Sequence, residues 1–339
     1  MKMSAQFKAE EFLPGQVMDR ITEVRVNEPS RVLQEAAARR IRPHLTNDGR
    51  LVIVAADHPG RFVTAAAGDP LAMSVRRQYL ARILRLLTQP NVDGIMSTPD
   101  VLDELLILSS FMRRRRGESF LDGKVMVGCM NRGGLAGASF EMNDRFGAYQ
   151  ASELKRMRID GAKMMFRLDL DNPDSGATIQ ACAEALRQLA EAGVTAFLEP
   201  LPVERVEGKY KVIKTAQAMA RIIGVATALG NSSRLLWLKV PYVEDYAAVA
   251  RASTCPLLML GGGSRDDPRE VISEFAAGMS AAGNVRGVLV GRNILFPGDN
   301  DPAAMASALG GLVHDGLSVD QAMDLYAQGG GQAPEPLDL

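Results

Sequence analysis

The feature that most constrains the fold of this chain is a series of eight short apolar segments, spaced roughly 30 to 40 residues apart as expected for βα units. The segments occupy residues 51–57, 92–97, 125–130, 161–167, 194–200, 235–240, 256–262 and 287–292. Between them lie longer segments, such as 70–87, 178–193 and 269–283, with apolar residues at spacings of three and four. That spacing is typical of amphipathic helices, so strands and helices are expected to alternate.

Strands that are apolar on both faces are typical of parallel sheets, and eight of them fit a closed barrel. We therefore predict an α/β fold with a single (β/α)8 TIM barrel over residues 51–328. No GxGxxG motif follows the first strand, and no break in composition divides the chain, which disfavours an open doubly wound sheet. Residues 1–50 are predicted to form an N-terminal helical extension, with a helix over 27–41 closing the barrel bottom. Residues 329–339 are predicted to be a flexible tail.

Charge and composition narrow the partners of the chain. Lys plus Arg number 39 and Asp plus Glu 40, and this balance predicts neither nucleic-acid binding nor attraction to an anionic membrane. No apolar segment approaches the roughly 18 residues of a membrane span, and the N-terminus does not resemble a signal peptide. The three cysteines form no CxxC pair and suggest buried thiols in a reducing compartment. We expect a cytoplasmic protein, and the apolar helix over 215–229 suggests a homo-oligomer.

Two acids and two lysines lie inside or at the end of predicted strands in positions that suggest chemistry. Asp57 ends the first strand, Lys163 lies in the fourth, Glu199 ends the fifth and Lys239 lies in the sixth. An isolated buried charge is costly, and the carboxyl ends of barrel strands meet at one face. Two lysines there favour chemistry, because burial and a neighbouring cation lower the pKa of an amine and make it nucleophilic. The two carboxylates would transfer protons.

Glycine-rich turns follow the last two predicted strands. Gly261, Gly262, Gly263 and Ser264 follow the seventh, and the eighth ends in Gly291 and Arg292. In (β/α)8 enzymes these two loops often bind phosphate through backbone N–H groups. The alternative is that the glycines only make tight turns.

Metal and thiol chemistry have less support in the sequence. Of the three histidines only His58 lies at a predicted strand end, so no metal site built from histidines is expected, although a magnesium ion held by carboxylates stays open. His58 is expected to form hydrogen bonds to the substrate or to orient it. Cys129 is a weak candidate nucleophile, because the sequence shows no basic partner for it.

The ordered motifs AADHP (55–59), GAKMMF (161–166), FLEPL (197–201), LKVPY (238–242), GGGS (261–264) and GRN (291–293) resemble the class I, Schiff-base aldolases. The resemblance is to the tagatose-bisphosphate, archaeal-type fructose-bisphosphate and autoinducer-processing aldolases, and more distantly to deoxyribose-phosphate aldolase. It implies a Schiff base on Lys239, with Asp57, Lys163 and Glu199 as the other catalytic residues and no cofactor. It also implies phosphate binding by Gly262, Gly263, Ser264, Gly291 and Arg292. The strand-five tyrosine of the archaeal enzymes is missing, which leaves the proton donor open between Glu199 and Asp57.

The opening AADHPGRF also resembles a bacterial subfamily associated with myo-inositol catabolism. That likeness implies cleavage of 5-dehydro-2-deoxy-6-phosphogluconate to dihydroxyacetone phosphate and malonate semialdehyde. Candidates to bind the substrate carboxylate are Arg61, Arg132, Arg167 and Arg205. A sugar-phosphate isomerase or epimerase, and a non-catalytic barrel that binds a sugar phosphate, remain as alternatives.

Overall fold

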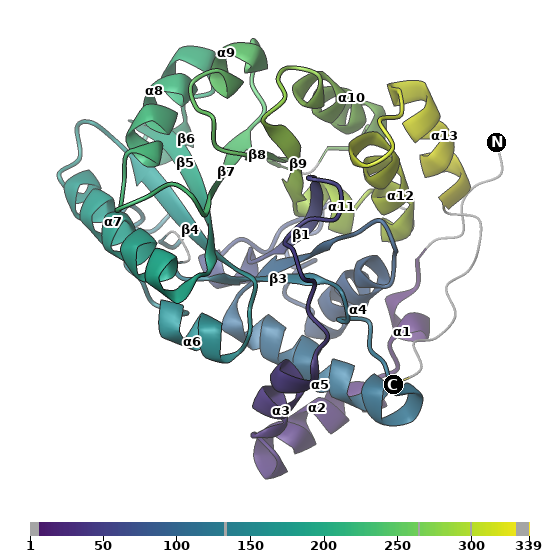
Figure 1. Ribbon diagram of the computed structural model, residues 1–339. Coiled ribbons are helices and arrows are strands. Elements are labelled where there is room, and N and C mark those ends of the chain that lie inside the picture. Colours follow the sequence, from purple (N-terminus) through teal and green to yellow (C-terminus); the bar gives the residue numbers. More distant parts are fainter. Residues whose placement is uncertain (1–6, 132–133, 264, 299, 330–338) are drawn as a thin grey trace.

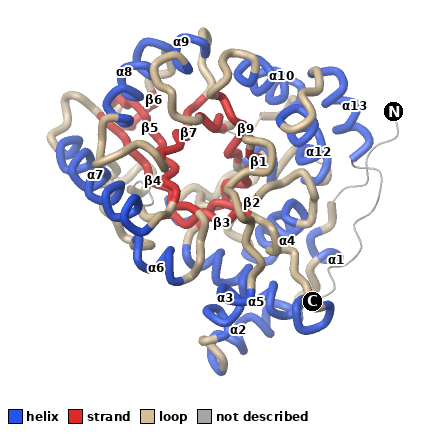
Figure 2. Tube along the Cα trace, viewed as in Figure 1, coloured by secondary structure: helices blue, strands red, loops and turns tan. Residues whose placement is uncertain are grey.

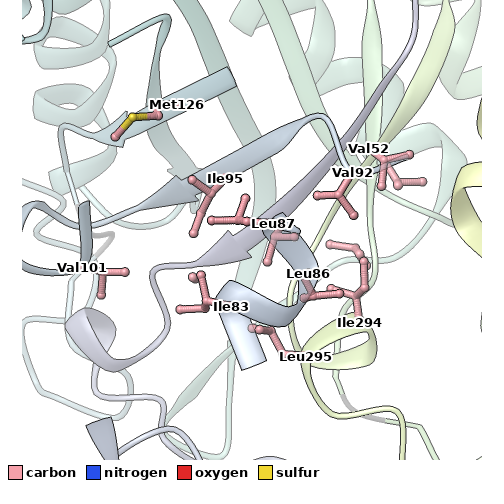
Figure 3. Packing of buried hydrophobic residues seen from close by; sticks show 14 of the residues in the cluster. Val52, Ile83, Leu86, Leu87, Val92, Ile95, Val101, Met126, Ile294 and Leu295 are labelled. Atoms are coloured by element: carbon pink, nitrogen blue, oxygen red, sulfur yellow. The ribbon is translucent and has the colours of Figure 1, made fainter. Parts of the chain in front are cut away.

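The barrel strands are apolar because each is buried on both faces in the computed structural model, which describes residues 7–131, 134–263, 265–298, 300–329 and 339. In β1 (Leu51–Ala56), Leu51 and Ile53 lie in a cluster inside the barrel. Val52 and Val54 lie in the larger cluster between strands and helices, part of which is drawn in Figure 3. Alternate residues of each strand therefore point to the barrel interior and to the helices.

Eight parallel strands close into a barrel, as Figures 1 and 2 show. β1 pairs with β2 and β9, and the pairing of β4 with β5 closes the ring. The predicted (β/α)8 architecture is thus confirmed. The other strands of the barrel are β2 (Gly94–Ser97), β3 (Val125–Cys129), β4 (Gly161–Leu168), β5 (Thr195–Val206), β7 (Leu236–Pro241), β8 (Leu257–Leu260) and β9 (Val285–Val290).

Helices surround the ring of strands (Figure 1). They are α4 (Arg76–Leu87), α5 (Pro99–Arg116), α6 (Ala151–Arg156), α7 (Asp174–Ala192), α8 (Ala216–Thr227), α9 (Tyr246–Ala250), α10 (Pro268–Met279), α11 (Arg292–Leu295), α12 (Pro302–Val313) and α13 (Val319–Gly329). A short 3-10 helix, η1 (Pro59–Arg61), follows β1. None of the helices in the described ranges is long and apolar enough to cross a membrane.

Three helices precede the barrel: α1 (Ala9–Phe12), α2 (Gln16–Asn27) and α3 (Arg31–Ala38). They pack on α4 and α5 outside the barrel, so the predicted closure of the bottom by a helix is wrong. The segment after α3 closes it instead. Arg39 donates to the carbonyl oxygens of Lys124 and Arg158, just before β3 and β4, and Leu45 packs on the interior cluster.

The sequence also left one element unpredicted. β5 continues past the barrel rim and forms an antiparallel hairpin with β6 (Lys209–Val212), with Glu207 and Gly208 at the turn. Both turn residues have positive φ, 52° and 79°, as a tight two-residue hairpin turn requires. The hairpin returns the chain to the carboxyl-terminal face of the barrel.

The domain limits expected from the sequence, at residues 50/51 and 328/329, remain predictions. β1 begins at Leu51 and α13 ends at Gly329, but residues 330–338 of the expected tail lie outside the described residues. Leu339 is buried, and its carbonyl oxygen accepts hydrogen bonds from Arg20 and Arg115.

Candidate active site

Four charged side chains meet in one cluster: Asp57 directly follows β1, and Lys163, Glu199 and Lys239 lie in β4, β5 and β7. The Nζ atom of Lys163 lies 3.1 Å from Oδ2 of Asp57 and 3.0 Å from Oε2 of Glu199. The Nζ atom of Lys239 lies 3.0 Å from the same Oε2 atom of Glu199. All four residues are buried. The structure therefore brings together the four residues that the sequence singled out as catalytic, in the order Asp57, Lys163, Glu199, Lys239.

The two lysines of this cluster have opposite pKa shifts. Burial lowers the pKa of Lys239, and the positive charge of Lys163 lowers it further, so that the opposing effect of Glu199 is outweighed. Burial acts on Lys163 in the same direction, but the adjacent carboxylates of Asp57 and Glu199 raise its pKa above the ordinary value. Lys163 is thus the permanent cation of the cluster, and Lys239 is the amine that loses its proton more easily.

The carboxylates stay ionised despite their burial. Burial raises the pKa of a carboxyl group and is the largest single effect, but the surrounding cations, led by Lys163, together outweigh it at both positions. The pKa of Asp57 is held well below its usual range, and that of Glu199 falls to about 2. Glu199 is therefore a charged acceptor beside the Nζ atom of Lys239 at any physiological pH.

A pocket of about 210 Å3 opens at this face of the barrel. Lys239 and Glu199 line it, whereas Asp57 and Lys163 are not among its lining residues. Small molecules that enter the pocket therefore meet Lys239 and Glu199 first. The other walls come from strand ends and from the loops that follow them, and include Val63, Leu201, Val212, Tyr242 and Leu260.

The glycine turns after β8 and β9 form one side of the pocket. Gly261, Gly262, Gly291 and Arg292 line it. Gly291 must be a glycine, because a Cβ atom there would lie 2.2 Å from Cε1 of His58. Of the other predicted phosphate-binding residues, Gly263 is exposed and does not line the pocket, and Ser264 lies outside the described residues.

Asn293 joins these two loops. Its Nδ2 atom donates to the carbonyl oxygen of Gly261 at 2.8 Å, and its Oδ1 atom accepts from the backbone N–H of Arg265 at 3.1 Å. Nη2 of Arg292 donates to the carbonyl oxygen of Gly262. The glycine turns are thus held in place before any ligand binds.

His58 and Arg61, the substrate-binding candidates of the first loop, both line the pocket. Burial, and the charges of Arg61, Arg292 and Lys239, lower the pKa of His58 to about 3 although Asp57 opposes them. His58 is therefore a neutral imidazole that can form hydrogen bonds but carries no charge.

Two of the other predicted carboxylate-binding arginines, Arg167 and Arg205, do not line the pocket. Arg167 is bound to Glu141 and Asp144 of the loop after β3, with Nη2 of Arg167 2.6 Å from Oδ1 of Asp144. Arg205 is exposed on the hairpin, and Arg132 lies outside the described residues. Cys129 is buried inside the barrel, where burial raises the pKa of its thiol, so it is a poor nucleophile.

Two further cations of the pocket were missed from the sequence. Lys214 reaches it because the β5–β6 hairpin returns the chain there, and Arg265 follows the glycine turn and forms an ion pair with Glu274 at 2.6 Å. The signal for Lys214 was the alternation of apolar residues at 201, 203, 210 and 212, which indicates a hairpin around the Glu207–Gly208 turn.

Comparisons with known structures place this geometry among (β/α)8 barrels. A fructose-bisphosphate aldolase from Slackia heliotrinireducens superposes with a TM-score of 0.63 at 15% identity, covering 95% of this chain and 96% of that one. A Schiff-base-forming fructose-1,6-bisphosphate aldolase superposes with a TM-score of 0.57 at 17% identity, covering 84% and 100%. At these identities the likeness concerns the fold.

One solved relative is much more similar. The Cgl0159 protein from Corynebacterium glutamicum (Brevibacterium flavum) is 36% identical and superposes with a TM-score of 0.83, covering 91% of this chain and 100% of that one. A sequence search of curated proteins found no match. The model of the Cgl0159-like family matches residues 49–309, which span the barrel and its candidate site. The chain therefore belongs to the Cgl0159-like family.

Proposed function

We propose that this protein is a class I aldolase that cleaves or forms a carbon–carbon bond in a phosphorylated keto sugar through a Schiff base on Lys239. The observation that carries the proposal is the asymmetry of the two lysines. Lys239 faces the pocket and has a lowered pKa, whereas Lys163 is held between two carboxylates behind it. A lysine nucleophile needs a neutral amine, and burial beside a second cation favours that form.

The proposed reaction begins when the neutral amine of Lys239 attacks the ketone carbon of the substrate. A C–N bond forms, the carbonyl oxygen takes up a proton, and the resulting carbinolamine loses water to give an iminium. The hydroxyl of the aldehyde half then loses its proton and becomes a carbonyl. The electron pair of the broken C–C bond moves to the iminium, which becomes an enamine. Protonation of the enamine and addition of water release the ketone and restore the amine.

Glu199 is the better candidate for the proton transfers of this sequence. It lines the pocket, and its Oε2 atom lies 3.0 Å from Nζ of Lys239. Asp57 does not line the pocket, and its Oδ2 atom binds Lys163. We therefore assign proton exchange with the substrate to Glu199, and to Asp57 the holding of the Lys163 cation that lowers the pKa of Lys239.

The proposed substrate is an anion. The pocket is lined by four cations besides Lys239, namely Arg61, Lys214, Arg265 and Arg292. Cations and glycine turns together suit a phosphate group. The resemblance of AADHPGRF to the inositol-catabolism subfamily suggests 5-dehydro-2-deoxy-6-phosphogluconate as the substrate, with dihydroxyacetone phosphate as the ketone product.

An isomerase or epimerase would use the same phosphate site with Glu199 as the base. A carboxylate with a pKa of about 2, bound by two ammonium groups, is a weak base for removing a proton from carbon. In the aldolase sequence the iminium makes the neighbouring C–H bond far more acidic than that of a free ketone, so proton exchange at carbon requires a weaker base. A non-catalytic binding barrel would need cations for the phosphate but not the Lys163–Glu199–Lys239 cluster.

Reductive trapping tests the proposal. The protein is incubated with dihydroxyacetone phosphate and sodium borohydride, and the modified peptide is identified by mass spectrometry. A reduced adduct on Lys239 is expected, and Lys239→Met is expected to abolish it. Lys214→Met is the matched control, because Lys214 also lines the pocket but is exposed. An adduct on Lys214 instead, or no adduct at ligand concentrations that saturate binding, would overturn the Schiff-base mechanism for this ketone.

A further inference from the structure

Two arginines of the pocket lack the partners that buried arginines elsewhere in the molecule possess. Arg61 ends η1, after β1, and Arg292 begins α11, after β9. Both line the pocket, and the Nε atom of each is buried without a hydrogen-bond partner among the described residues. In that part of the chain neither guanidinium forms an ion pair, and Arg292 has one hydrogen bond, to the carbonyl oxygen of Gly262.

A buried Nε atom without a partner is not by itself unusual in this protein. Arg39 has one too, but its Nη atoms bind Asp160 and two backbone carbonyls. Arg265 in the same pocket has Glu274. The carboxylates of the site are already bound to the two lysines. Among the described arginines that have a buried side-chain nitrogen without a partner, Arg61 and Arg292 are therefore the two without a carboxylate in an ion pair.

The two arginine-bearing loops lie against each other where Gly291 meets His58. The backbone N–H of Arg61 donates to the carbonyl oxygen of His58 at 2.9 Å, and Gly291 lies against the His58 ring. The next residue, Phe62, has a φ of 65°, a left-handed conformation that is strained for a bulky residue. Its side chain is 74% exposed. Strain of this kind persists where the surroundings fix a turn, and here the turn directs Arg61 to the pocket.

Two partly buried like charges repel each other, and a buried donor without an acceptor is destabilising. Burial lowers the pKa of Arg292, and the charge of Arg61 lowers it further. Such a pair is unfavourable in the free protein, and a group with two negative charges and several acceptor oxygens removes both penalties at once.

We propose that Arg61 and Arg292 together bind one dianionic group, the phosphate of the substrate, between the loops that follow β1 and β9. This inference deepens the proposed function and rests on it only for the identity of the molecule that carries the phosphate. It assigns Arg61 to the phosphate, in place of the substrate carboxylate that the sequence suggested.

Binding of inorganic phosphate, measured by isothermal titration calorimetry, tests the shared site. The proteins compared are wild type, Arg61→Gln, Arg292→Gln and the double variant. Each single change is expected to weaken binding at least tenfold. The double variant is expected to be only slightly weaker than either single variant, because one ion held by two groups gives strongly non-additive losses. Arg205→Gln, which removes a charge from the exposed hairpin outside the pocket lining, is expected to change binding less than twofold.

Other outcomes of the titration would overturn the proposal. These are no binding of phosphate to the wild type, wild-type binding by Arg61→Gln, or additive losses in the double variant. Tighter binding of malonate than of phosphate would overturn the assignment to phosphate. The melting temperature of each ligand-free single variant is expected to equal or exceed that of the wild type, because each removes a repulsive charge, and saturating phosphate is expected to reverse that order.

Trapping with two ketones separates this proposal from the aldolase proposal. The ratio of trapping efficiency for dihydroxyacetone phosphate to that for neutral dihydroxyacetone is expected to fall at least tenfold in Arg61→Gln. An unchanged ratio with adducts on Lys239 would overturn the shared phosphate site and leave the aldolase mechanism in place. Phosphate binding that depends on both arginines, without any adduct, would support the shared phosphate site and overturn the aldolase mechanism.

Discussion

The two ends of the barrel both contain buried charges, but the charges bind different kinds of partner. At the carboxyl-terminal mouth, in the described chain, Lys163 and Lys239 bind only the carboxylates of Asp57 and Glu199. At the amino-terminal floor, the charges bind the backbone of the strands. Oδ2 of Asp93 accepts from the N–H of Val52.

Charges of the floor also pair with one another, as Asp93 does with Arg42 and His314, but they bind backbone groups in addition. Oδ2 of Asp160 accepts from the N–H of Met126, and Arg39 binds Asp160 and two carbonyl oxygens. These charges satisfy backbone groups at the starts of strands, where the ladder has no further partners. Burial of charge alone therefore does not identify a site. Charges that bind one another beside a pocket indicate chemistry, and charges that bind strand ends indicate structure.

Among the variants that test this distinction, the largest expected loss is the loss of turnover on replacement of Lys239. Lys239→Met is expected to reduce turnover roughly 10⁴-fold or more, as loss of a covalent catalytic group does. Thermal stability is expected to change little, because Glu199 keeps Lys163 as its partner. The measurements are retro-aldol turnover and the melting temperature. A variant that unfolds readily while its folded fraction remains active would assign Lys239 to structure and remove the difference between mouth and floor.

The second largest expected effect is a loss of stability when Arg39 of the floor is replaced. Arg39→Met is expected to reduce the free energy of unfolding by about 3–5 kcal/mol, because it leaves Asp160 and backbone carbonyls without their buried partner. Urea unfolding measures the loss. Arg40→Met is the matched control, since its side chain is 64% exposed and its ion pairs with Glu118 and Asp122 should contribute less than about 1 kcal/mol. Equal losses in the two variants would contradict a structural role specific to the floor.

A subtler effect concerns the electrostatics of the mouth. Lys163→Met removes the cation that lowers the pKa of Lys239, and that pKa is expected to rise. Since only the neutral amine attacks a ketone, the rise of trapping rate with pH should move to higher pH. Lys163→Arg, which keeps the charge, should move it less. A pH dependence identical to that of the wild type would show that burial alone, without Lys163, sets the reactivity of Lys239.

The sequence predicted the mouth better than the floor for a physical reason. Lys163 and Lys239 interrupt apolar strands, and such interruptions are visible one residue at a time. The charges of the floor lie in turns, where charged residues are common, so nothing distinguishes Arg39 from exposed Arg40 beside it. Their difference depends on which carbonyl groups the fold brings near.

The incorrect expectation for Arg167 and the missed hairpin also depend on contacts that only the folded chain creates. Arg167 looked available to a substrate, but Glu141 and Asp144 bind it from a loop more than 20 residues earlier in the chain. The hairpin of β5 and β6 was missed because it is largely exposed and polar, and its turn places a glutamate at positive φ, which is rare. Lys214 was therefore not expected in the pocket.

The smallest expected effect uses the floor histidine, His314, whose Nδ1 atom lies 2.8 Å from Asp48 and whose Nε2 atom lies 3.0 Å from Asp93. The carboxylate of Asp93, and then that of Asp48, raises its pKa to about 9 against the opposing effect of burial. Because the folded pKa exceeds the unfolded value of about 6.5, the protonated imidazolium stabilises the fold. That contribution is complete below pH 6.5 and is lost as pH rises through 9.

Replacing His314 with Gln removes this titration. The variant then shows whether the charges of the floor affect stability alone or also the reactivity of Lys239 at the mouth. The free energy of unfolding of the wild type should exceed that of His314→Gln by about 1 kcal/mol at pH 6, a value reduced by solvent screening at this half-buried position. The difference should shrink towards pH 9.5, as measured by urea unfolding. Borohydride trapping on Lys239 should follow the same pH curve in both proteins, because the floor charges bind strand ends far from the pocket lining. A shifted trapping curve would mean that floor and mouth are electrostatically coupled, and the division between structural and chemical charges would then fail.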